Sequence, residues 1–397
     1  MEPATPPSSG AEPPPLPPPA PKRILPGVFR LLGPMLAALV LGCFIDGELG
    51  HFLTESWAAA PFAVLCVLAY AGLDRPVARV LSWLLLFAFL AVFVFLNVIF
   101  TLAALHDLSG GKDLPDTLPV ATVWRLLTVG GLSVLAALTA LLPLSGAWRR
   151  LCSLLAGAGE WTSVRILALA TVSSLSLVIC VPLLVLGEPP LLLLLRNSSD
   201  PSAFLDPGRG IAGLYLNTLY DLCRTLVAAA LAVGYGVRRD WGETLARLGL
   251  RRITLRETGL AVALTGLLLG LVHFADKGIA AVWQNFHWPV TDMDAFTVLL
   301  APFITPVGAV VIGITAGVGE EVAVRGILQP RLGILLSNVF FTSLHASQYH
   351  WDGLAIVFLI GLALGFIRKK TSTSVSAIVH GSYDFVLILY AFLSGEM

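Results

Sequence analysis

The chain has 397 residues, of which 56% are hydrophobic and only 13% are charged, and its mean hydropathy is +0.84. This composition excludes an ordinary soluble protein and predicts a polytopic membrane protein. The formal net charge is zero, which argues against a nucleic-acid partner, since binding a phosphate backbone requires an excess of basic residues.

Residues 1–24 form a Pro-rich tail that contains the run Pro-Pro-Pro-Leu-Pro-Pro-Pro at 13–19. A segment with so few core-forming residues is expected to be disordered. Its basic residues, Lys22 and Arg23, stand at its end, whereas a signal peptide has its basic residues at the start. The sequence therefore predicts a disordered cytoplasmic tail that is not a signal peptide.

The apolar runs predict an all-α fold, a polytopic transmembrane helical bundle of about eleven spans, at roughly 20 apolar residues per crossing. The span cores are expected at residues 27–45, 58–73, 80–105, 124–144, 166–186, 213–237, 259–275, 295–313, 332–346, 353–367 and 373–393. The sequence leaves open whether the eighth span breaks near Pro306 or continues as one helix into residues 316–330.

Three regions follow the tail. Residues 25–237 are expected to form an N-terminal transmembrane region of about six helices, in which Asp221 and Arg224 share a helix face as a structural ion pair. Residues 238–258 mix apolar and basic side chains without the length to span, which predicts an amphipathic cytoplasmic connector. Residues 259–397 form the C-terminal transmembrane module, and most of the candidate chemistry lies there.

The basic connections alternate with connections that are poor in Lys and Arg. With eleven spans, the segments around Arg23, 238–256 and 368–370 all fall on one side, which predicts a cytoplasmic N-terminus. The composition indicates an integral protein of a prokaryotic cytoplasmic membrane, with membrane lipids as partners. The oligomeric state is not predicted.

The most informative stretch is Glu320-Glu321-x-x-x-Arg325, which places ionisable groups in an apolar region where they are costly. In a helix, Glu321 and Arg325 are four residues apart and can form a salt bridge, whereas Glu320 points about 100° away. Small residues at Ala316, Gly317, Gly319 and Gly326 permit close helix approach. Pro330 is expected to end the segment.

Two further pairs follow, Phe341-x-x-x-His345 and His380-x-x-x-Asp384, each on one helix face. Counted at about 1.5 Å per residue, the glutamates and both histidines lie roughly 10–20 Å from the basic side. These side chains are therefore expected to converge in one polar cavity that opens to the cytoplasm.

Such a cavity suits hydrolysis. A carboxylate in an apolar site is a more effective base near neutrality, so Glu320 is the candidate that deprotonates a water. Histidines across the cavity, His345 and His380, can orient that water or stabilise an oxyanion. Two histidines and a carboxylate could instead bind zinc. The chain has no His-Glu-x-x-His motif, however, and adjacent glutamates diverge on a helix, so we predict no metal site and no cofactor.

On these residues the chain resembles the CAAX protease and bacteriocin-processing family of intramembrane endopeptidases, which includes the type II CAAX prenyl endopeptidase. That family carries Glu-Glu-x-x-x-Arg, Phe-x-x-x-His and His-x-x-x-Asn on successive membrane helices. The first two motifs match in full as Glu320-Glu321-x-x-x-Arg325 and Phe341-x-x-x-His345. The resemblance covers roughly residues 243–393.

The resemblance implies roles for these residues. Glu320 would be the general base, with His345 helping to activate water, and His380 with residue 384 would form the oxyanion site. Glu321 and Arg325 would hold the helix or the substrate, a peptide or protein at the membrane. The third motif departs from the pattern, because an ionised Asp384 cannot donate a hydrogen bond as Asn does.

The leading hypothesis is an intramembrane endopeptidase that acts near the cytoplasmic face on a CAAX-type or other substrate. The alternatives are a non-catalytic membrane scaffold that retains the fold, motivated by Asp384, and a proton-coupled transporter, motivated by Asp221, Arg224 and the two glutamates.

Overall fold

The computed structural model describes residues 24–106, 118–156, 160–198 and 210–395. The predicted tail up to residue 23 lies outside them. Within the described residues the regular structure is helical, apart from an isolated bridge between Tyr235 and Arg239, and this confirms the predicted all-α fold.

The N-terminal region begins with helices that differ widely in length. Its elements are α1 (Ile24–Gly42), α2 (Glu48–Glu55), η1 (Ser56–Ala58), α3 (Ala60–Ala71), α4 (Pro76–Leu105), α5 (Val120–Leu138), η3 (Thr139–Leu144), α6 (Gly146–Ala156), α7 (Ser163–Leu186), α8 (Pro190–Asn197) and α10 (Gly210–Ala232). In α10, Asp221 and Arg224 form the predicted ion pair, with Arg224 Nη2 2.6 Å from Asp221 Oδ1. Arg224 also contacts Glu55, at 3.3 Å.

The connector and the C-terminal module are α11 (Trp241–Leu248), α12 (Leu255–Phe286), α13 (Met293–Leu300), η4 (Ala301–Phe303), α14 (Pro306–Ile314), η5 (Thr315–Glu320), η6 (Val322–Leu328), α15 (Gln329–Ser343), α16 (Trp351–Lys370) and α17 (Thr373–Ser394). Capping boxes begin both α11 and α12: Asp240 with Glu243, and Thr254 with Glu257. The connector is thus a short helix followed by an extended link.

Seven of the described helices are long and apolar enough to cross a membrane, and an eighth results if the bent pair Glu48–Ala58 and Ala60–Ala71 is one span. These helices identify an integral membrane protein. The seven include Pro306–Ser343 as one span, although the non-helical backbone of Gly333 divides this stretch into two helices, where two spans were expected. In addition, α10 carries Asn217, Asp221 and Arg224 and is not among the seven.

The helical path that carries the two glutamates begins at Pro306, and a break at residues 304–305 separates it from η4. Thr305 caps the N-terminus of α14, and the helical path runs on through residues 316–330. The predicted end at Pro330 is wrong, because Pro330 stands in the first turn of α15, where proline is tolerated. The path is interrupted at Gly333, whose φ of 77° is readily adopted by glycine.

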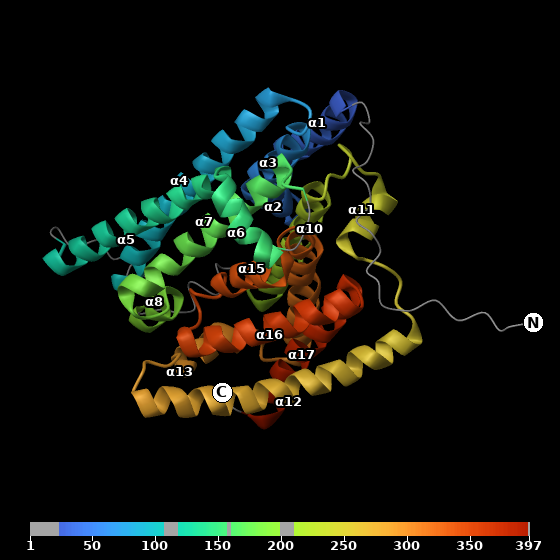
Figure 1. The fold of residues 1–397 in the computed structure, drawn as a ribbon. Helices are drawn as coiled ribbons and strands as arrows, with labels where there is room; N and C mark the ends of the chain where they lie inside the picture. The colour runs from blue at the N-terminus through green and yellow to red at the C-terminus, as the bar shows by residue number, and fades with distance from the viewer. Residues whose placement is uncertain (1–23, 107–117, 157–159, 199–209, 396–397) are drawn as a thin grey trace, which may run out of the picture.

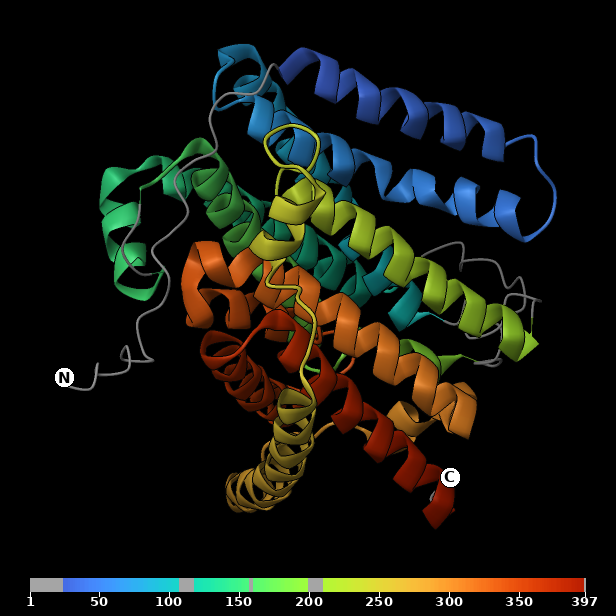
Figure 2. The ribbon, with the colours of Figure 1, turned by 90° about the vertical axis from the view of Figure 1, so that its right-hand side faces the viewer.

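Two groups of helices pack against each other. In the first, α4, α5 and α7 enclose a core that includes Leu86, Leu90 and Leu167. In the second, α17 packs against α14, η5, α12 and α16. α7 contacts α15, and α10 contacts η5 and η6, so these helices join the groups. α12 runs along the outside of the second group (Figure 1) and is seen nearly end-on in Figure 2.

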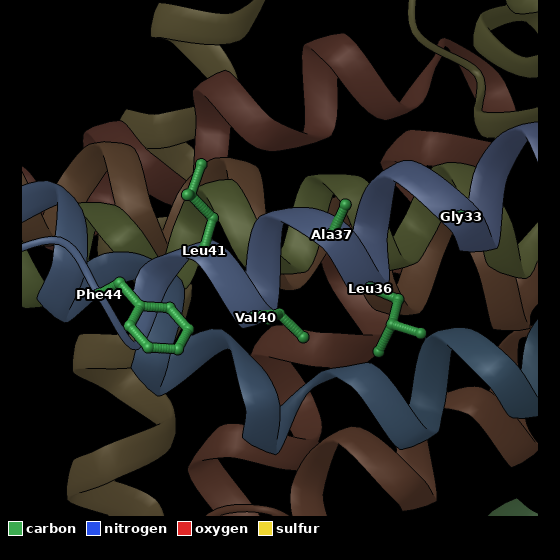
Figure 3. Close-up of a pocket in the computed structure, with 6 residues that line it drawn as sticks. All are labelled: Gly33, Leu36, Ala37, Val40, Leu41 and Phe44. Carbon is green, nitrogen blue, oxygen red and sulfur yellow. The ribbon is translucent and has the colours of Figure 1, made fainter.

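The exposed side of α1 is apolar. Gly33, Leu36, Ala37, Val40, Leu41 and Phe44 line a hollow of about 540 Å³ there (Figure 3). The side chains of Leu36 and Phe44 are exposed in the protein by itself, as expected of a surface that faces lipid. This hollow contains none of the predicted site residues.

Candidate active site

Glu320 and Glu321 lie where two π-helical turns meet, since η5 ends at Glu320 and η6 begins at Val322. π-Helical turns are rare and occur frequently at functional sites. The turns set the two carboxylates in different surroundings, one buried against α17 and one partly exposed.

Glycines bring these turns close to α17. A Cβ atom at Gly317 would lie 2.6 Å from Cα of Gly381 and 2.7 Å from the carbonyl oxygen of Ala377, closer than real Cβ contacts allow. The close helix approach predicted from the small residues is confirmed at this position. It is looser at Gly326 and Gly319, where the nearest atoms would lie 3.1 and 3.4 Å away.

Glu321 is fully buried, and its carboxylate is surrounded by partners. Nη1 of Arg325 lies 3.2 Å from its Oε1, which confirms the predicted salt bridge. The Ser376 hydroxyl donates to Oε2 at 2.5 Å, and Nδ1 of His380 lies 3.1 Å from Oε1. A buried charge requires such pairing. Glu321 therefore has no surface left for a substrate or a bulk water.

Arg325 is also buried, and it ties the π-helical segment to its neighbours. Its Nη2 donates to the carbonyl oxygen of Gly361 in α16 at 2.9 Å. The guanidinium group stands over the ring of Phe341, 4.5 Å from the ring centroid. Arg325 thus fixes Glu321 on one side and Phe341 on the other.

His380 occupies the centre of the cluster, because carboxylates face both of its ring nitrogens. Nδ1 faces Glu321, as described above. Nε2 lies 3.5 Å from Oδ2 of Asp384 and 3.9 Å from Oε2 of Glu320. The structure therefore brings together four of the predicted residues, Glu320, Glu321, His380 and Asp384, around a single imidazole.

Glu320 is the most accessible carboxylate of the cluster. Its side chain is 38% exposed, compared with 20% for Asp384 and 0% for Glu321. Its closest charged contact is the 3.9 Å approach to His380. This geometry agrees with the prediction that Glu321 is paired with Arg325 while the carboxylate of Glu320 is left accessible.

His345 stands apart from this group. Its Nδ1 lies 3.0 Å from the carbonyl oxygen of Phe341, one turn earlier. Its ring meets the Phe341 ring edge-on at 4.9 Å between centroids, and Phe341 in turn meets the His380 ring at 6.2 Å. Among these described residues, no hydrogen bond or ion pair links His345 to Glu320. His345 contacts the cluster only indirectly, through the ring of Phe341.

Sequence reasoning missed two members of the site, Ser376 and Gly361. Ser376, His380 and Asp384 are spaced four residues apart on α17, so the helical period could have added Ser376 to the same face. Gly361 acts through its backbone carbonyl, and a residue pattern does not reveal that contact.

The described residues contain no group of three or more His, Cys, Asp or Glu side chains arranged to hold a metal ion. We therefore assign no metal ligands.

Residues 302–386 match the family model described as type II CAAX prenyl endopeptidase Rce1-like. The matched segment runs from η4 into the second half of α17 and contains all seven residues singled out from the three motifs. The match confirms the resemblance, over a shorter range than the motifs indicated. No curated protein and no solved structure matches the chain.

Proposed function

We propose that this protein hydrolyses a peptide bond of a membrane-associated peptide or protein, using water activated by Glu320, since residues 302–386 match the model of the type II CAAX prenyl endopeptidase Rce1-like family. The observation that carries the proposal is the cluster around His380. It places one accessible carboxylate beside a histidine in an otherwise apolar part of the chain.

Glu320 is the general base of the proposed reaction. It takes a proton from water, and the resulting hydroxide attacks the carbonyl carbon of the scissile bond. The protonated Glu320 then gives the proton to the leaving nitrogen as the C–N bond breaks, so the base is restored. Glu321 cannot take this role while it is held by Arg325, Ser376 and His380.

His380 stabilises the oxyanion in this proposal, through the N–H of Nε2. Asp384 lies 3.5 Å from that nitrogen and orients the ring, and as a neutral acid it would itself be a hydrogen-bond donor. The family resemblance gives His345 a part in water activation, although its ring contacts Phe341 and not Glu320 in this structure. No metal ion and no cofactor enter the proposed reaction.

The reaction would take place near the cytoplasmic face of a prokaryotic membrane, with the N-terminus on that side. The support for this orientation is the alternation, along the sequence, of connections rich in Lys and Arg with connections poor in them. Prenylated CAAX sequences are one substrate class, and other membrane-associated peptides are a second.

The test compares Glu320→Gln with wild type and with Asp276→Asn, which removes an exposed acid from α12 in the same module. Cleavage of a farnesylated CAAX peptide and the appearance of new N-termini in the membrane proteome are measured together. We expect Glu320→Gln to lose activity by roughly 10²- to 10⁴-fold, with Asp276→Asn unchanged.

Equal processing by Glu320→Gln and wild type would contradict the proposal. A second candidate function is a non-catalytic membrane scaffold, which the Asp384 departure favours. It predicts that no proteolytic product distinguishes the variants, while a cellular phenotype of the deletion is complemented by a double variant that lacks Glu320 and His345.

A further inference from the structure

A second concentration of charge surrounds the hydroxyl group of Tyr70, outside the candidate active site. Nη2 of Arg331 donates to this hydroxyl at 2.6 Å, and Nη1 of Arg239 lies 3.4 Å from it. Tyr70 and Arg331 are buried, while Arg239 is partly exposed. Two guanidinium groups from distant parts of the chain therefore meet at one neutral oxygen.

Arg247 is the third member of this cluster. Its Nη1 donates to the carbonyl oxygen of Gly326 at 3.2 Å. Burial, followed by the positive charge of Arg331, lowers the pKa of Arg247 to about 9, and the charge of Arg239 acts in the same direction. Nη1 of Arg331 donates to the carbonyl oxygen of the next residue, Ile327, at 2.6 Å, so Arg247 and Arg331 bind adjacent backbone carbonyls.

The hydrogen-bond acceptors of the three arginines are neutral oxygens. Besides Tyr70 and Gly326, they are the backbone carbonyls of Ile327, Ala232 and Val233. No carboxylate of the described residues forms an ion pair with Arg239, Arg247 or Arg331.

The acids closest along the chain are engaged in other contacts. Asp74 pairs with Arg238, and Asp240 and Glu243 form the capping box of α11. Three like charges gathered in a partly desolvated place repel one another, so an added anion would lower their energy.

We propose that Arg239, Arg247 and Arg331 form a binding site for a phosphate group, carried by an anionic lipid headgroup or by free phosphate. The planar guanidinium group matches the oxygens of a phosphate, and basic pockets between transmembrane helices bind lipid headgroups. Arg239 and Arg247 are partly exposed and accessible to the anion, and Tyr70 holds Arg331 behind them.

The bound phosphate would join helices from distant parts of the chain. Tyr70 belongs to α3, Arg247 to α11 and Arg331 to α15, and α11 also contacts η6. An anion shared by these arginines would therefore stabilise the contact between the N-terminal region and the helices of the candidate active site.

The test uses the full-length protein in nanodiscs. Thermal unfolding is followed in phosphatidylcholine alone, in phosphatidylcholine with added phosphatidylglycerol, and in phosphatidylcholine with inorganic phosphate in the buffer. We expect an anion to raise the unfolding midpoint of the wild type by roughly 5 °C when the site is saturated. Native mass spectrometry would also show retained phosphatidylglycerol.

Arg247→Gln removes one charge but keeps a donor for the Gly326 carbonyl, and it should lose most of this shift. Arg247→Lys should keep part of it. The matched control is Arg252→Gln, which removes an exposed charge from the same connector. A shift with phosphatidylglycerol identifies a lipid as the occupant, and an equal shift with inorganic phosphate identifies the free anion.

Either result, if lost in Arg247→Gln and kept in Arg252→Gln, supports the site. An unchanged wild-type midpoint in both anionic conditions would overturn it. So would equal losses in the two Gln variants, because a general surface-charge effect would then explain the shift.

Discussion

Neighbouring glutamates in this protein have very different surroundings. Glu321 is fully buried and makes three close polar contacts, whereas the Glu320 side chain is 38% exposed and approaches one histidine at 3.9 Å. The same amide substitution should therefore mainly lower stability at Glu321 and mainly lower activity at Glu320.

Glu321→Gln should lower the free energy of unfolding by about 3–5 kcal/mol, because Arg325 would be left buried without its counter-charge. Glu320→Gln should change it by less than about 0.5 kcal/mol, as expected of a partly exposed group. Thermal unfolding in detergent micelles measures both. Similar unfolding midpoints for the two variants would show that the buried pair is not a major source of stability.

Asp384→Asn should retain or increase the proposed peptidase activity. An amide can accept from Nε2 of His380 and can also donate to an oxyanion, which an ionised carboxylate cannot do. Asp384→Ala, which loses both abilities, should lower kcat/KM by about tenfold or more. An equal loss in Asp384→Asn and Asp384→Ala would mean that the carboxylate charge is required.

At the scale of the helices, the site depends on the close glycine crossing of η5 and α17. Backbone atoms of Gly381 and Ala377 leave no room for a methyl group at Gly317. The crossing places Glu321 within hydrogen-bonding distance of both Ser376 and His380, so the geometry of the cluster depends on it.

Gly317→Ala should therefore lower the free energy of unfolding by about 1–3 kcal/mol through overpacking. Gly319→Ala is the matched control, since its methyl group would meet only the end of the Leu222 side chain, at 3.4 Å. Alanine also has the higher helix propensity, so this variant should be neutral or gain up to about 1 kcal/mol. The prediction fails if unfolding midpoints in micelles show equal effects.

At the scale of the whole molecule, polar contacts join the two groups of helices. Nε of Arg165 in α7 donates to the carbonyl oxygen of Arg331 at 2.8 Å, and Arg331 reaches Tyr70 in α3 and Ala232 in α10. Separation of the regions would expose these buried groups together with the apolar faces that cover them.

Residues 238–397 expressed without the rest of the chain should therefore aggregate in detergent. Co-expression with residues 1–237 should restore a monodisperse complex, because the lost contacts can form between two chains. Size-exclusion chromatography of the purified samples is the measurement. A monodisperse C-terminal fragment with the wild-type unfolding midpoint would show that the module folds by itself.

Much of this protein could be read from sequence alone. Hydropathy determined the all-α membrane fold, since a chain in a bilayer must satisfy its backbone hydrogen bonds internally. The period of one helix determined the salt bridge between Glu321 and Arg325 and the separation of Glu320 from it. The two fully matching motifs, with the third in part, indicated the resemblance that the family model matches over residues 302–386.

Only the tertiary structure decided how those helices meet. The contacts of Glu321 with Ser376 and His380 join residues 55 and 59 positions apart. Periodicity fixes the direction of a side chain around its own helix, but the partner depends on where the neighbouring helix crosses. For that reason the sequence missed Ser376, expected His345 beside Glu320, and gave no sign of the arginines that gather around Tyr70.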